Sequence, residues 1–125
     1  MKWNIKKLRS EVWTFLTDKE VEIHLINIKG TGEKGTAAYC TWEGEVFCVY
    51  VDFCECDVAY ATVHEVFHQI FDPHFKKIAT YNLYEYWIQS MEKIFFKNMN
   101  YKEKKKWYNM IRSKIVNNPE KERSE

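Results

Sequence analysis

The sequence predicts an α+β domain in which helices accompany a three-stranded, mainly antiparallel sheet. Three observations favour this class. Apolar residues recur at spacings of three and four near the N-terminus, short segments between residues 21 and 53 alternate apolar and polar positions, and the helical spacing returns after residue 57. At 125 residues the chain has the length of one domain with a small core.

The first helix is expected over residues 3–16, with its apolar side covering one face of the sheet. A strand follows at residues 21–28, where Val21, Ile23 and Leu25 alternate with polar residues. This alternation is typical of a strand with one buried face.

Residues 29–35 contain three glycines and predict a loop. This loop lacks the Gly-Lys-Ser/Thr ending of a phosphate-binding loop and opens no helix, so it does not indicate a nucleotide site. Two further strands are expected at residues 36–43 and 45–53, joined by a short turn at Glu43-Gly44.

The next helix is expected to begin at Asp57, which is a plausible N-cap residue. It should end near Phe71, because Pro73 disfavours helical geometry at Asp72. A linker from Asp72 to Tyr81 is expected to follow.

A long helix is predicted over residues 82–99, with Glu85 and Glu92 just past the edge of its broad apolar arc. A last helix at 102–116 carries an apolar stripe against a basic face. The predicted domain therefore covers residues 1–116, and residues 117–125 form a flexible C-terminal tail.

The helix after Asp57 contains the string His-Glu-Val-Phe-His at residues 64–68. On a helix, His64 and His68 lie one turn apart on the same face, where both imidazoles can bind one metal ion. Glu65 lies about 100° round the helix, where a carboxylate can reach a metal-bound water without being a ligand. A histidine at a core margin is usually structural, but the three residues at this spacing favour the HExxH motif of zinc peptidases.

A catalytic zinc site needs three protein ligands and one open position. His64 and His68 supply two of them, and Glu85 on the next helix is the preferred third. Glu92 and Asp72 remain alternatives, and His74 is the runner-up because its spacing fits the longer HExxHxxGxxH pattern. In that pattern a glycine stands where this chain has a bulky phenylalanine.

The arrangement resembles the gluzincins, zinc metallopeptidases in which HExxH is followed by a glutamate ligand on a second helix. The order of elements looks like the very small members called minigluzincins, and like peptidase-like domains of phages. This resemblance implies a zincin-like fold, Zn²⁺ bound by His64, His68 and Glu85, Glu65 as general base and acid, and a peptide or protein substrate. It also implies a latent form blocked by a terminal segment. The chain departs from the larger gluzincins in its shorter interval between His68 and Glu85, and in having Gln89 where they place an acid.

The net charge of +1 does not indicate a nucleic acid or a membrane as a partner. The chain shows no signal region or membrane span, so we expect a cytoplasmic protein. Seven basic residues against one acid between Lys97 and Lys114 leave an alternative open, a SprT-like or regulatory zinc module that associates with DNA or a protein partner without turnover. A solvated helix face is the commoner explanation of such a run.

The four cysteines all precede the HExxH helix and are expected to be thiols at buried or edge positions. Their spacing does not match a paired C-x2-C zinc motif. His24 alternates onto the polar side of its strand, and we expect an ordinary surface histidine there rather than an extra site residue.

Overall fold

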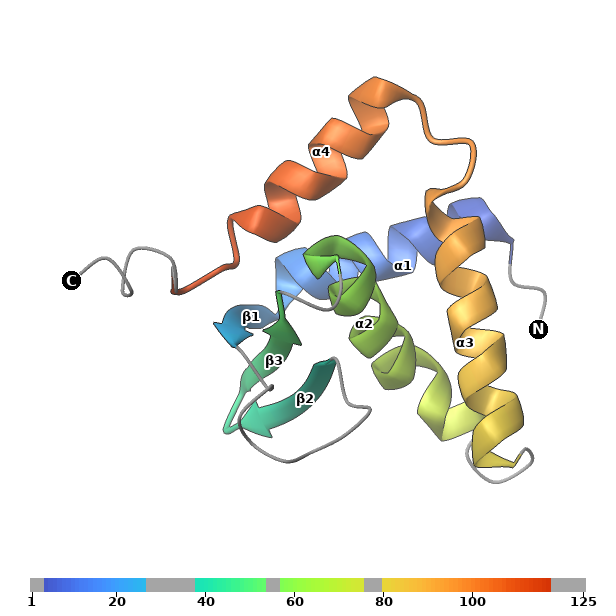
Figure 1. Ribbon diagram of the computed structural model, residues 1–125, viewed down its shortest axis with the longest axis horizontal. Helices are drawn as coiled ribbons and strands as arrows, with labels where there is room; N and C mark the ends of the chain where they lie inside the picture. Colours follow the sequence, from blue (N-terminus) through green and yellow to red (C-terminus); the bar gives the residue numbers. More distant parts are fainter. Residues whose placement is uncertain (1–3, 27–37, 54–56, 76–79, 118–125) are drawn as a thin grey trace.

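The computed structural model describes residues 4–26, 38–53, 57–75 and 80–117. These residues form an α+β arrangement of helices and a mixed three-stranded sheet (Figure 1). The elements in chain order are α1 (Ile5–Asp18), β1 (Glu20–Ile26), β2 (Ala38–Glu43), β3 (Val46–Asp52), α2 (Val58–Phe75), α3 (Tyr81–Phe96) and α4 (Tyr101–Arg112). Helix α2 is central, because it contacts the other three helices as well as β2 and β3.

The sheet has the strand order β1-β3-β2. Strand β2 pairs with β3 in antiparallel fashion, but β1 pairs with β3 in parallel, so the prediction of a mainly antiparallel sheet is wrong for β1. The alternating pattern identifies the buried face of a strand but not its neighbour or direction. As the middle strand, β3 carries Phe47, Val49 and Val51, all fully buried.

The hairpin between β2 and β3 has a two-residue loop, since Glu43 is paired with Val46. Gly44 opens this loop with a positive φ of 64°, a conformation that glycine adopts without the strain of a Cβ atom. The turn thus lies where the glycine predicts it.

Helix α1 is capped by Asn4, whose side chain accepts a hydrogen bond from the Lys7 amide at 2.8 Å. It ends at Asp18, two residues beyond the predicted end at Leu16. Arg9 lies on the polar side of the helix, yet its guanidinium donates to the Phe95 carbonyl at 2.9 and 2.7 Å and to the Lys97 carbonyl at 2.9 Å. Those carbonyls belong to the end of α3, so Arg9 joins the two helices.

Helix α2 begins at the predicted N-cap, because Asp57 accepts hydrogen bonds from the amides of Ala59 and Tyr60 at 2.9 and 3.1 Å. The predicted end near Phe71 and the linker starting at Asp72 are wrong, since α2 continues through Pro73 to Phe75. Residues 76–79 of the predicted linker lie outside the described residues.

Two sets of contacts explain why Pro73 does not end the helix. The Asp72 carboxylate accepts hydrogen bonds from His68 at 3.0 Å and from the Tyr84 hydroxyl at 2.5 Å. The Phe75 ring packs on Trp87 with a centroid distance of 5.0 Å. These contacts outweigh the steric bias that proline imposes on the residue before it.

Helix α3 is shorter than predicted and ends at Phe96, where the chain turns through Asn98 with a φ of 65°. Its apolar arc is also narrower, because Leu83 and Ile94 are 65% and 47% exposed. Tyr84, Ile88 and Phe95 are the buried arc residues of this helix, and Trp87 and Met91 are half-buried against the core.

Helix α4 ends at Arg112 rather than at Val116. The chain then runs beside β1, with hydrogen bonds from the Ile23 amide to the Lys114 carbonyl (2.9 Å) and from the Val116 amide to the Ile23 carbonyl (3.0 Å). The Asn117 side chain bonds both the amide and the carbonyl of Leu25 at 2.8 Å. The start of the predicted tail is therefore attached to the sheet, and residues 118–125 lie outside the described residues.

Within the described segments, none of the helices combines the length and the apolar character needed to cross a membrane.

Candidate metal centre

Helix α2, which carries the HExxH residues, lies between the sheet and α3 (Figure 1). The helical geometry predicted from the sequence places His64 and His68 on one face, and their rings lie with centroids 4.9 Å apart. Both side chains are half-buried, whereas Glu65 is buried with 7% of its surface exposed. A carboxylate with so little contact with water is held among protein groups rather than solvated.

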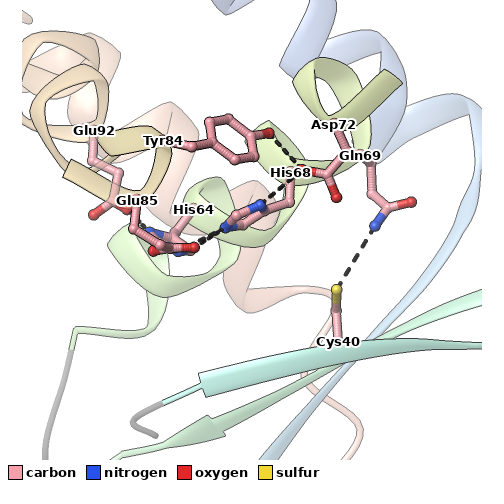
Figure 2. A network of polar contacts seen from close by, with 8 residues as sticks. All are labelled: Cys40, His64, His68, Gln69, Asp72, Tyr84, Glu85 and Glu92. Atoms are coloured by element: carbon pink, nitrogen blue, oxygen red, sulfur yellow. Dashed lines mark hydrogen bonds and ion pairs between the residues drawn. The ribbon is translucent and has the colours of Figure 1, made fainter. Parts of the chain in front are cut away.

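Helix α3 brings Glu85 to the same point (Figure 2). The Nε2 atoms of His64 and His68 are 3.2 Å apart. One Glu85 oxygen lies 3.3 Å from Nε2 of His64, and the other lies 2.6 Å from Nε2 of His68. Bonds of about 2.0–2.1 Å to a tetrahedral zinc ion separate its ligands by about 3.3 Å. The 3.2 and 3.3 Å separations match this spacing, whereas the 2.6 Å separation between Glu85 and His68 has the length of a hydrogen bond. Two imidazoles and a carboxylate are a donor set that suits zinc.

A carboxylate lies against the far nitrogen of each imidazole. Nδ1 of His64 contacts Glu92 of α3, and Nδ1 of His68 is 3.0 Å from Asp72, one turn further along α2. An acceptor at Nδ1 favours the tautomer that carries the proton there, which leaves the lone pair on Nε2. Histidines that ligate metals are usually oriented in this way.

Tyr84 fixes the position of Asp72. Its hydroxyl donates to the same Asp72 oxygen that contacts His68, at 2.5 Å, and its ring meets the His68 ring edge-on at 5.3 Å. Burial and this hydrogen bond to Asp72 raise the pKa of Tyr84 far above its ordinary value. The phenol thus remains a neutral donor at any physiological pH.

The surroundings of the two histidines are strongly acidic. Burial lowers the pKa of His64, but the hydrogen bond to Glu92 and the charges of Glu92, Glu65 and Glu85 outweigh it, so the net pKa is raised. With Asp72, four carboxylates surround two imidazoles. This excess of negative charge favours a bound cation.

Strand β2 forms the opposite side of the site, where Cys40 faces α2 (Figure 2). Gln69 of α2 donates from Nε2 to the Cys40 sulfur at 3.8 Å and accepts from the Trp42 indole at 2.9 Å. Burial, followed by the charge and hydrogen bonding of Glu65, raises the pKa of Cys40 to about 12. The Glu65 carboxylate therefore lies beside Cys40 of this strand.

The four candidates for a third ligand occupy different places. Glu85 contacts both Nε2 atoms, whereas Glu92 and Asp72 contact the Nδ1 atoms. His74 is an exposed residue in the last turn of α2, and the described cluster of metal-binding groups on this face comprises His64, His68 and Glu85 without it. The geometry thus gives each of the three carboxylates a distinct position.

Sequence reasoning did not identify Cys40, Trp42, Gln69 or Tyr84 as neighbours of the site. The alternation of β2 places Cys40 and Trp42 on one face, but it does not show that this face meets α2. Comparisons of the chain with protein-family models, with curated proteins and with solved structures found no match.

The position of Cys40 predicts slow alkylation. Because the thiolate is the reactive form, iodoacetamide at pH 8 should modify Cys40 of the metal-free protein about a hundredfold more slowly than a free cysteine. Glu65→Gln should increase this rate, since it removes a negative charge beside the thiol, but burial should keep it below that of a free cysteine. Mass spectrometry of the Cys40 peptide measures the rate.

Glu11→Gln, which changes an exposed residue of α1, serves as the control and should leave the rate unchanged. A rate that is equal in Glu65→Gln and in the unmodified chain would show that Glu65 does not lie beside Cys40.

Proposed function

We propose that this chain is a zinc-dependent peptidase that hydrolyses peptide bonds. The observation that carries the proposal is the convergence of two Nε2 atoms and the Glu85 carboxylate on one point, with a carboxylate against each Nδ1 atom. A histidine pair that served only packing would not require this polar support at both ring nitrogens.

The residues that would hold the ion are His64, His68 and Glu85. Two imidazoles with one carboxylate are the protein ligands of a catalytic zinc site, in which a fourth position stays open. Bound there, Zn²⁺ supplies the Lewis acidity that makes water nucleophilic near neutral pH. Asp72 and Glu92 orient the two rings through their Nδ1 atoms.

Glu65 moves the proton in this proposal. Glu65 follows His64 in the chain, and its carboxylate is buried beside Cys40. Water gives a proton to Glu65 while its oxygen bonds to the peptide carbonyl carbon. When the carbon–nitrogen bond breaks, Glu65 returns the proton to the leaving amine.

Strand β2 is the proposed support for an extended substrate. It is an edge of the sheet, and among the described residues its outer side pairs with no other strand. The outer side of β1 is already used, because Ile115 forms a bridge with Ile23. A peptide could therefore add to β2 through backbone hydrogen bonds, beside the residues Cys40 and Trp42 that face α2.

The basic run leaves the DNA-associated alternative as a prediction, because exposed lysines suit a solvated helix face and a phosphate-binding face equally. Lys102, Lys104, Lys105 and Lys106 are exposed on α4, as expected of a solvated helix face. Lys106 lies over the Trp13 ring at 4.6 Å, which gives this lysine a role within the fold. The proposed latent form stays a prediction, since residues 118–125 lie outside the described part and Asn117 is bound to β1.

Substitutions in α2 separate the roles of metal binding and proton transfer. Glu65→Gln should retain zinc but lose peptidase activity by at least about a hundredfold, because glutamine cannot accept the proton. His68→Ala should lose the zinc ion held by the HExxH site, one ion per chain, together with activity. Metal analysis and cleavage of a panel of unstructured peptides measure the two properties.

His74→Ala provides a matched control on the same helix and should retain both zinc and activity. Peptidase activity that survives Glu65→Gln would exclude Glu65 as the base. Loss of this zinc ion in His74→Ala would show that His74 is the third ligand.

The carboxylates at the Nδ1 atoms should determine zinc affinity without binding the ion. Glu92→Gln and Asp72→Asn each remove a charge that orients an imidazole, and each should weaken zinc binding by about 10- to 100-fold. Competition with a chromophoric chelator measures the affinity, and Glu11→Gln is again the control. Unchanged affinity in both variants would contradict this role.

A further inference from the structure

The outer face of the sheet carries a second group of metal-binding side chains. Glu22 and His24 come from β1 and Cys48 from β3, and their donor atoms all lie within 4.8 Å of one another. Parallel pairing makes this possible, because it places Glu22 opposite Cys48 and His24 opposite Tyr50. These residues alternate with the core residues of their strands, so they face away from α2.

The His24 ring is held with its Nε2 atom toward this group. It stacks on Tyr50 with a centroid distance of 4.8 Å and an interplanar angle of 17°, and Tyr50 stacks on Tyr39 in the same way. Nε2 lies 3.3 Å from a Glu22 oxygen, but it is shielded from solvent and has no hydrogen-bond partner in the described structure. A buried ring nitrogen without a hydrogen bond is costly unless another ligand satisfies it.

The Cys48 thiol lies in an acidic environment. It is fully buried, and its pKa is raised by burial and by the carboxylates of Glu43 and Glu22. Glu43 accepts a hydrogen bond from the Tyr50 hydroxyl at 3.2 Å, which keeps its carboxylate near this part of the sheet. The carboxylates of Glu22 and Glu43 therefore lie near the sulfur and the imidazole. A cation bound at this point would reduce the repulsion between the two carboxylates.

We propose that Glu22, His24 and Cys48 bind a second divalent metal ion, of which Zn²⁺ is the best fit, with Glu43 available as a fourth ligand. Sulfur, nitrogen and carboxylate oxygen together suit zinc and exclude ions such as Mg²⁺ and Ca²⁺, which prefer oxygen ligands alone. This ion would join β1 to β3 on the face opposite the HExxH site. Its role would be to hold the parallel strands together, since closed sites of this kind contribute to folding.

Cobalt(II) distinguishes the two sites in the full-length chain. The HExxH site offers no sulfur, whereas a cobalt–thiolate bond gives a charge-transfer absorption band in the near ultraviolet. With the thiols kept reduced by a phosphine, titration of the metal-free protein with Co²⁺ should produce this band. It should persist in His68→Ala and Cys40→Ser and be lost in Cys48→Ser.

Glu22→Gln tests the site without disturbing the buried thiol. It should weaken the cobalt affinity measured from the same band by about tenfold or more, whereas Glu20→Gln on the same strand should change it by less than about threefold. The absence of the band from the unmodified chain would overturn the proposal. So would a band that survives Cys48→Ser or an affinity that is insensitive to Glu22→Gln. His68→Ala removes a ligand of the HExxH site alone. The cobalt result therefore does not depend on whether the chain is a peptidase.

Discussion

The structure around the HExxH helix depends on the orientation of two imidazole rings. Each ring is held from behind by a carboxylate, Asp72 at His68 and Glu92 at His64. This arrangement directs both Nε2 atoms toward Glu85 and favours, in each ring, the tautomer with its proton on Nδ1. Without these carboxylates the rings could rotate about their side-chain bonds, and the three donors would share no common point.

The orientation in turn depends on how α2 and α3 pack. Asp72 can reach His68 only because α2 continues one turn beyond the motif, through a proline that local preferences would place outside the helix. Tyr84 of α3 bonds Asp72, and Glu85 and Glu92 extend from the same helix toward the histidines. The contacts that stabilise the end of α2 are therefore also those that complete the site.

Much of the fold and part of the site could be predicted from the sequence, because local patterns carry that information. Helical spacing identified the four helices, and the HExxH string identified His64 and His68 as neighbours on one face. The parallel direction of β1 could not be predicted, since the pairing of strands distant in sequence leaves no local mark. For the same reason Cys40 was not identified beside Glu65, and the Glu22, His24 and Cys48 cluster was not expected. Helix α2 extends beyond its predicted end at Phe71, because tertiary contacts there outweigh the effect of Pro73.

Zinc binding between α2 and α3 is tested most directly by an anomalous-scattering map at the zinc absorption edge, from crystals of this 125-residue chain grown with zinc. We expect a peak bonded to Nε2 of His64, Nε2 of His68 and the Glu85 carboxylate, with a further coordination position left to solvent. A peak bonded through either Nδ1 atom, one in which Glu85 takes no part, or no peak between α2 and α3 would contradict this expectation.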